Sequence, residues 1–219
     1  MDKKGFTLME VMVTLVVFSI VMLTLFSSFQ AFVSSGDSIT RGIQDSERAR
    51  TALERIREDL EQVHMVQPPR YRVPAFNAPP DPFRMAGSRT RVGGSVFSRL
   101  EFTTFSRVIT GPEEARGISK IIYYVRQNPD KGFDLCRSDR EPGTPGEEDP
   151  CRDPVLMEEI QAFDIEFTDN RKETGTDWDS DSADVEHAMP VNLHIRLKTG
   201  DRAGVFETSV FLPVARGGP

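Results

Sequence analysis

The sequence predicts an α+β protein in which one long N-terminal α-helix packs on an antiparallel β-sheet head, built as one sheet or two. Three observations predict this class. A continuous apolar run occupies residues 6–33, an amphipathic helical pattern follows it to about residue 66, and strand-like runs dominate from residue 99 onward. No helical pattern interrupts the strands, which favours an antiparallel arrangement over a parallel one.

The apolar run from Phe6 to Val33 contains no Gly or Pro, and Glu10 is its only charged residue. With a rise of about 1.5 Å per residue, the part beyond Glu10 is long enough to cross a hydrocarbon core of roughly 30 Å. The alternative is a cleaved secretory signal, which has an apolar region of about 7 to 15 residues followed by a small-residue cleavage site. Here the small residue, Gly5, precedes the run, so we expect a spanning helix.

Glu10 is the first candidate functional residue. A carboxylate at the edge of a membrane helix is costly unless a partner neutralises it, and such residues are commonly functional. The alternative is an acid that sits at headgroup level, where the N-terminus of a helix tolerates negative charge.

Length and charge limit the remaining possibilities. The chain has 219 residues, and removing a helix of roughly 60 leaves one ordinary domain. The formal net charge of −7 disfavours nucleic acid and acidic lipid surfaces as partners. Lys3 and Lys4 precede the apolar run, so the positive-inside rule places the leader in the cytoplasm and the head outside, which in a bacterium is the periplasm.

The helix is expected to continue through residues 34–67 as an amphipathic segment. Its apolar residues recur at spacings of three and four, which indicates one packed face: Ile39, Ile43, Ala49, Ala52, Leu53, Ile56, Leu60 and Val63. This face could pair with a second helix in a coiled coil or lie against the protein's own head. Pro68 and Pro69 then end the helix, near residue 66.

Residues 68–94 are rich in Pro, Arg and Gly and predict an ordered loop, with one short strand near residues 71–73. The segment is locally basic, through Arg70, Arg72, Arg84, Arg89 and Arg91. These side chains could bind an acidic partner surface or pair with the domain's own acids.

Six runs rich in β-branched and aromatic residues predict strands. The two near residues 163–167 and 191–197 alternate apolar and polar residues, as half-buried strands do. The six runs are residues 99–109, 118–125, 133–137, 162–169, 191–199 and 204–213.

Cys136 precedes an acidic, Pro-rich loop over residues 138–154, and Cys151 lies near the end of that loop. In an oxidising compartment, an even cysteine count favours a disulfide, and one closing this loop would add about 3 kcal/mol of stability. The alternative is two thiols that never meet. Two cysteines with no histidine nearby are too few ligands for a typical zinc site.

Asp177, Asp179 and Asp181 have the opening spacing of a calcium-binding loop. The rest of that pattern is missing, because Ser182 stands where glycine is needed and Ala188 where the bidentate glutamate belongs. Calcium bound in a looser geometry and a solvated acidic loop both stay open, and we assign no metal site.

We expect no enzymatic activity and no cofactor. The sequence contains no phosphate-binding glycine loop and no nucleophile elbow. The three histidines, His64, His187 and His194, are scattered and complete no catalytic or metal-binding set.

The segment KGFTLMEV resembles the processing site of type IV prepilin-like proteins. The resemblance implies that a prepilin peptidase cuts between Gly5 and Phe6 and that Phe6 becomes the N-methylated first residue. It also implies that Glu10 pairs with the N-terminal amine of a neighbouring subunit during assembly. Such a pair supplies the partner that a carboxylate in lipid needs.

The head is similar, in its succession of strands, to the J-type minor pseudopilin of the type II, or general, secretion pathway. The resemblance rests on LEFT, IIYYV, VLMEEIQAFDIEFTD, MPVNLHIRLKT and FETSVFLPV. It implies a leader at 1–5, a filament-core helix at 6–33, its amphipathic continuation at 34–67 and a periplasmic head at 68–219. The implied partners are other minor and major pseudopilins, the inner-membrane assembly platform and secreted substrate proteins.

Three functions follow as hypotheses. The first is a non-enzymatic subunit near the tip of a periplasmic pseudopilus, anchored by a single pass in the bacterial inner membrane. The second is a minor pilin of a type IV pilus, acting in adhesion, motility or DNA uptake. The third is a membrane-anchored periplasmic binding module that does not polymerise.

Overall fold

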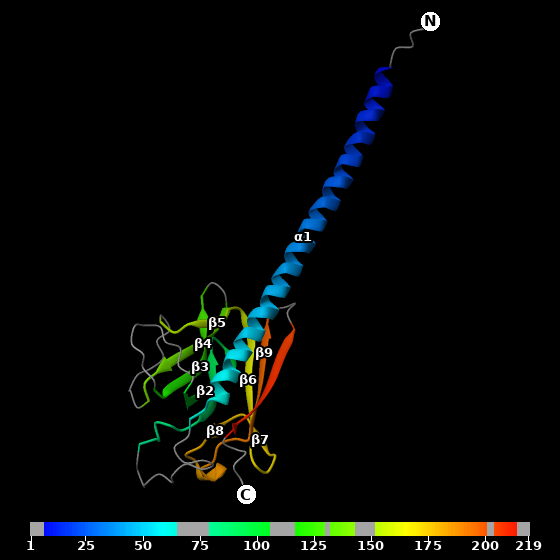
Figure 1. Ribbon diagram of the computed structural model, residues 1–219. Coiled ribbons are helices and arrows are strands. Elements are labelled where there is room, and N and C mark those ends of the chain that lie inside the picture. The colour runs from blue at the N-terminus through cyan, green and yellow to red at the C-terminus, as the bar shows by residue number, and fades with distance from the viewer. Residues whose placement is uncertain are drawn as a thin grey trace. The chain divides into compact units, whose positions relative to one another are not determined.

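The computed structural model describes residues 7–64, 79–105, 117–129, 132–142, 152–200 and 204–213 (Figure 1). It confirms the predicted fold class, a long N-terminal helix with an antiparallel β head, and it shows two sheets. The chain divides into two compact units, Met1–Gln44 and Asp45–Pro219. The second unit therefore contains the end of the helix as well as both sheets.

Helix α1 spans Leu8–Glu61. It begins where Thr7 accepts a hydrogen bond from the backbone N–H of Glu10, 3.3 Å from the Thr7 hydroxyl oxygen. It ends about five residues earlier than we predicted from the two prolines. The reason is pairing with the sheet, because Val63 forms a β-bridge with Thr104 and the His64 N–H donates to the Thr103 carbonyl at 2.7 Å.

In the first unit, the segment Leu8–Phe32 of α1 is long and apolar enough to cross a membrane, and none of its described residues is buried in the protein. Three of its hydroxyl side chains bond to the helix's own backbone. Thr14 donates to the Glu10 carbonyl at 2.6 Å, Ser19 to Leu15 at 2.8 Å and Thr24 to Val21 at 2.8 Å. These bonds satisfy the hydroxyl protons without help from water.

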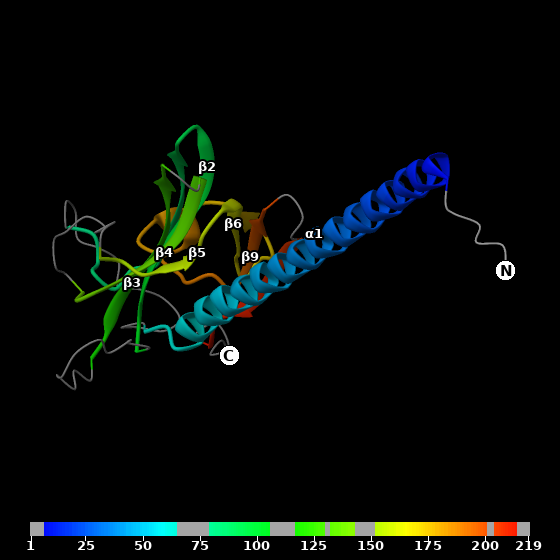
Figure 2. The same cartoon turned by 90° about the horizontal axis from the view of Figure 1, so that it is seen from above.

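The second unit holds a six-stranded and a four-stranded sheet, in which all paired strands are antiparallel (Figures 1 and 2). The larger sheet has the order β5 (Val155–Met157), β4 (Gly132–Arg140), β3 (Ser119–Asn128), β2 (Ser95–Thr104), β1 (Ala86–Val92), β8 (Trp178–Asp179). The smaller has the order β10 (Val205–Phe211), β9 (Asn192–Thr199), β6 (Ile160–Thr168), β7 (Thr174–Gly175). A short 3-10 helix, η1, covers Ala183–Val185.

One hydrophobic core joins the end of α1 to both sheets. Ala49, Ile56 and Leu60 of α1 are fully buried in it. The apolar face of the helix thus packs inside its own molecule, which answers the coiled-coil alternative for residues 49–63. Ile43 was wrongly placed on this face, since its side chain is 59% exposed and lies in the first unit.

Strand β1 corrects the prediction of a loop up to residue 94. Its residues Ser88 to Arg91 are all exposed, so the strand lacks the apolar alternation that reveals a half-buried strand. Gly93 and Gly94 connect it to β2 in a two-residue hairpin, with positive φ angles of 53° and 91°. Such a turn needs positive φ at both positions, which glycine adopts without strain.

The remaining differences concern strand ends. Strand β2 begins four residues before the predicted start, whereas β6, β9 and β10 lie close to the predicted ranges. The very short strands β5, β7 and β8 were not predicted. The strand expected near residues 71–73 lies outside the described residues.

Candidate assembly site

Glu10 lies in the first turn of α1, and its residue is exposed. Its backbone N–H bonds to the carbonyl and the side chain of Thr7, so the first turn of the helix is capped. Phe6 and the leader before it, including Gly5, lie outside the described residues. Between Leu8 and Phe32, Glu10 is the one charged residue, so its carboxylate has no cation in its own segment.

Between Thr14 and Ser28, the face of α1 that carries Glu10 is made of small and β-branched residues. At spacings of three and four residues along the helix, it presents Thr14, Val17, Val21, Thr24 and Ser28. Larger residues lie to one side of this face, roughly 80° to 160° around the helix axis from Glu10: Leu15, Phe18, Met22, Phe26 and Phe29. Helices approach one another closely in membranes where their facing residues are small, so the Glu10 face can receive a neighbouring helix.

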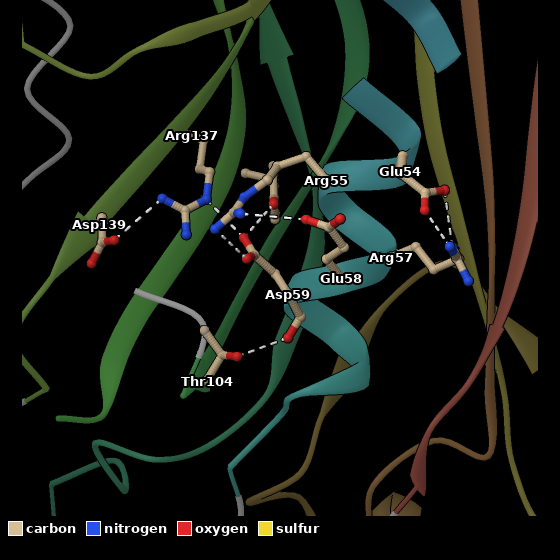
Figure 3. A network of polar contacts seen from close by, with 9 residues as sticks. Glu54, Arg55, Arg57, Glu58, Asp59, Thr104, Arg137 and Asp139 are labelled. Carbon is tan, nitrogen blue, oxygen red and sulfur yellow. Dashed lines mark hydrogen bonds and ion pairs between the residues drawn. The ribbon is translucent and has the colours of Figure 1, made fainter. Parts of the chain in front are cut away.

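A second feature of the structure is a buried ionic cluster that ties α1 to the larger sheet (Figure 3). The Asp59 carboxylate is fully buried. Arg137 Nε of β4 lies 2.7 Å from its Oδ2, Arg55 Nη2 lies 2.8 Å from its Oδ1, and the Tyr123 hydroxyl of β3 donates to Oδ2 at 2.6 Å. Asp139 also belongs to the cluster, because its Oδ2 lies 3.3 Å from Arg137 Nη1.

The backbone around this cluster is fixed as well. The Thr104 hydroxyl, at the end of β2, bonds to the Asp59 carbonyl at 2.8 Å and to the Gln62 carbonyl at 2.9 Å. These bonds satisfy carbonyls that the last turn of a helix leaves without a partner. The end of α1 is therefore held to three strands by polar contacts in addition to apolar packing.

The cluster shifts the pKa values of two of its members, Tyr123 and Arg137. Burial raises the pKa of Tyr123 well above its usual value, and the neighbouring Asp59 charge raises it further. Burial alone would lower the pKa of Arg137, but the hydrogen bond and charge of Asp59 outweigh it, so the net pKa is raised. Tyr123 is thus held neutral and Arg137 charged.

The exposed side of the same helical segment carries ion pairs that face solvent. Arg57 pairs with Glu54 and, at 3.0 Å, with Glu61, while Arg55 lies 3.4 Å from Glu58. Exposed pairs of this kind contribute little to stability.

The acidic residues expected in a calcium-type loop are used for internal pairing. Asp179 Oδ2 lies 2.7 Å from Arg84 Nη1, Asp181 Oδ2 accepts the Asp81 N–H at 2.8 Å, and Asp177 accepts the Arg89 N–H at 3.3 Å. Within the described residues, no three His, Cys, Asp or Glu side chains are grouped so that they could hold a metal ion.

The basic segment shows the same internal pairing. Besides Asp179, Arg84 lies 3.5 Å from Glu101, and Arg89 lies 3.4 Å from Asp164. Arg91 is exposed on β1, and Arg70 and Arg72 lie outside the described residues. The two paired arginines support pairing with the domain's own acids over a dedicated contact for an acidic partner.

Cys136 is a fully buried thiol on β4. Burial raises its pKa to about 11. Cys151 lies outside the described residues, so the disulfide between them stays a prediction. Asp153, two residues after Cys151 in the sequence, bonds to the Tyr124 hydroxyl at 2.9 Å, and Tyr124 is the register partner of Cys136.

The three histidines lie in separate places. His64 makes edge contacts with the rings of Phe83 and Phe105, and burial lowers its pKa. His194, on β9, contacts the hydroxyl of Ser209, on β10, at 3.0 Å. His187 follows η1. The structure brings none of them together with another.

Sequence reasoning identified Glu10 but missed the Asp59 cluster. One signal was available, because Asp59 follows Ala52 and Ile56 at helical spacing and lies next to Leu60, on the side expected to be buried. A charged residue on that side indicates a buried partner.

Comparison with protein families matches residues 1–26 to the family described as the prokaryotic N-terminal methylation motif. No curated protein matches the chain. The matched segment contains Gly5, Phe6 and Glu10 and most of the exposed apolar helix. It indicates processing by a prepilin peptidase and assembly into a pilus-like polymer, and it fits a single-pass, membrane-anchored protein. The motif and the fold together support a type IV pilin-like protein, either a pseudopilin or a pilin.

Proposed function

We propose that this protein is a minor pseudopilin of a type II protein secretion system, a non-enzymatic subunit near the pseudopilus tip that helps to start assembly. The observation that carries the assembly role is the unburied apolar helix Leu8–Phe32 with Glu10 as its single charge, inside the methylation motif. A helix that the head leaves uncovered can be covered by lipid before assembly and by other helices afterwards.

In this proposal, cleavage after Gly5 creates a new amine on Phe6, and Glu10 pairs with the amine of a neighbouring subunit. An unpaired carboxylate and an unpaired ammonium are each expensive in an apolar medium, whereas a close pair is much less so. The small residues on the Glu10 face let the two helices approach closely enough for that contact. Assembly is thus coupled to processing, because the amine exists only after the leader has been removed.

The head supports a mechanical role. Residues 45–61 of α1 are joined to both sheets by the core, and Asp59 links them to β3 and β4. A force applied through the helix would reach the sheets through this buried cluster. The secreted substrates that such a subunit contacts would meet the head.

Assignment to the type II pseudopilus rests on the strand succession that resembles the J-type minor pseudopilin. The same N-terminal motif also favours a minor pilin of a type IV pilus as the second candidate. The net charge of −7 argues against direct DNA contact by the head.

The test is a pull-down of the processed, detergent-solubilised full chain against the minor pseudopilins encoded beside it. We expect the chain to retain at least one of them, and to retain it after Glu54→Gln, which changes only an exposed pair. If none of them binds, the tip assignment is wrong. Binding to subunits of a pilus that has a retraction ATPase would instead favour the second candidate.

A further inference from the structure

Strand β10 is an edge strand of the smaller sheet, and it is the longest of the edge strands among the described residues. It pairs with β9 on one side and with no described strand on the other. The other edge strands, β5, β7 and β8, have three, two and two residues. Short edge strands protect a sheet from pairing with other chains. Strand β10 has seven residues and contains no Lys, Arg or Pro, so it lacks that protection.

The register shows which backbone groups of β10 are available. The Leu212 N–H donates to the Val191 carbonyl at 3.1 Å, continuing the pairing of Phe211 with Asn192. Backbone groups of residues two apart point to the same side of a strand. Phe206, Thr208 and Val210 therefore bond toward β9, and the N–H and C=O groups of Val205, Glu207, Ser209 and Phe211 point to the open edge.

The side chains of the same four residues lie on the exposed face. Val205 is 52% and Phe211 59% exposed, at the two ends of the strand. Between them, Glu207 pairs with Arg196 at 2.7 Å and Ser209 contacts His194. An added strand would thus meet an apolar residue at each end and a polar, acidic centre.

We propose that the open edge of β10 binds an extended segment of a different protein chain, which adds to the four-stranded sheet as a fifth strand. The segment would carry apolar side chains opposite Val205 and Phe211 and no acid opposite Glu207. Backbone hydrogen bonds give affinity in this mode, and alternate side chains give specificity. The inference concerns the head alone, so it can fail without affecting the role of Glu10, and the reverse also holds.

A second copy of this protein is a poorer occupant. A symmetric pair of copies would join the two β10 strands, in antiparallel pairing about a two-fold axis perpendicular to the strands. Figure 1 shows β10, the red strand, running in nearly the same direction as the last turns of α1. Such a pair would place the two copies' residues 45 at opposite ends of the dimer, although both chains would come from one membrane.

A free peptide is not restricted in this way and serves as the probe. Antiparallel pairing of a VFETSVF peptide with β10 places Val opposite Phe at each end and Glu opposite Ser in the middle. Aromatic and β-branched cross-strand pairs are favourable, and no like charges face each other. We would use this peptide with two added lysines at each end, labelled with a fluorophore, and the full chain in detergent micelles.

The matched variants are Ser209→Pro and Ser209→Ala. Both remove the contact with His194, but only proline also removes the N–H at the open edge, and proline is tolerated where that N–H does not bond inside the sheet. We expect saturable binding by the wild type and S209A within twofold of each other, and at least tenfold weaker binding by S209P. Equal binding by S209P and S209A, or no saturable binding to the wild type, would overturn the proposal.

Amide hydrogen exchange of the wild type gives a test that needs no variant. On peptide binding, exchange should slow at Val205, Glu207, Ser209 and Phe211 and stay unchanged at Phe206, Thr208 and Val210. Slowing at the second set alone, or at neither, contradicts strand addition. A dimer of full chains that S209P abolishes would instead show that the occupant is a second copy.

Discussion

At the scale of single residues, the buried carboxylate of Asp59 is the group on which the helix and the larger sheet depend together. It accepts contacts from Arg137, Arg55 and Tyr123 with almost no access to water. The interior is a poor medium for a lone charge, so removing one member of such a set leaves the others uncompensated.

We therefore predict that Asp59→Asn destabilises the protein by about 3 to 5 kcal/mol, because Arg137 stays buried without its counter-charge. Urea unfolding of the full chain in micelles, followed by tyrosine fluorescence and circular dichroism, measures the change. The control is Glu54→Gln on the exposed side of the same helix, which should leave the unfolding midpoint unchanged. A midpoint for Asp59→Asn equal to that of the control would contradict the buried-pair interpretation.

The raised pKa of Tyr123 predicts that the folded protein loses stability at alkaline pH. Because burial and the Asp59 charge raise its pKa in the folded state, the folded protein holds the phenol proton more tightly than the unfolded chain does. This contribution is complete below the unfolded pKa of about 10 and is lost as the pH rises above it. The free energy of unfolding should fall more steeply between pH 9.5 and 11 in the wild type than in Tyr123→Phe, and parallel curves would refute the prediction.

The residues differ in how far sequence could identify them. Glu10 could be found because it is the single charged residue among the 28 positions from Phe6 to Val33. The helical spacing could have shown that Asp59 faces the core, but not that Arg137 is its partner, because the two residues lie 78 positions apart in the chain. Only the folded register brings Tyr123 and Arg137 opposite each other on β3 and β4.

At the scale of elements, close contact between the two sheets depends on Gly87 of β1. A Cβ added there would lie 2.1 Å from the ring carbon Cζ of Phe167 on β6. The ring stacks on Trp178, with centroids 6.0 Å apart, so it has limited freedom to move away.

Gly87→Ala should therefore destabilise the protein by about 1 to 3 kcal/mol, the usual cost of overpacking. The measurement is again the urea midpoint. In a Phe167→Leu background the same substitution should cost less, since the smaller side chain leaves room for the methyl group. Identical costs in both backgrounds would show that the contact does not limit the packing.

The two sides of the apolar helix also predict different sensitivities. Val21→Phe places a large ring on the Glu10 face and should reduce incorporation into filaments several-fold, because neighbouring helices could no longer approach closely. Met22→Phe places a ring about 100° around the helix axis from Val21, where large residues already lie, and should be tolerated. Immunoblots of sheared filaments and membranes measure incorporation, and equal loss in both variants would argue against a preferred face.

Sequence periodicity predicted those elements whose two faces differ. Strands β6 and β9 alternate buried and exposed residues, and the final 13 residues of α1 carry one apolar face. It missed β1, because an exposed strand with Arg, Ser and Thr has no apolar alternation, and it misplaced the end of α1, because Val63 and His64 pair with a strand 39 or more positions away. The position of β1 and the end of α1 both depend on pairing with strands that are distant in the sequence, and a local sequence pattern does not show such pairing.

At the scale of the whole molecule, the chain combines an uncovered apolar helix with a head that has its own core. The boundary between the two units falls after Gln44, within the single helix α1. The last turns of the helix belong to the head, because they pack in its core and because Asp59 binds its strands. Sequence alone predicted both parts and their order, but the division of the helix between them required the packing of residues 49–60 to be known.

The central claim is that Glu10 drives incorporation into a filament by pairing with the new N-terminal amine of a neighbour. The most direct measurement compares wild type and Glu10→Ala, expressed with the major subunit and the prepilin peptidase, for processing, membrane level and presence in sheared filaments. We predict normal cleavage and membrane insertion with at least a tenfold loss from filaments. Incorporation of Glu10→Ala at the wild-type level would contradict the claim.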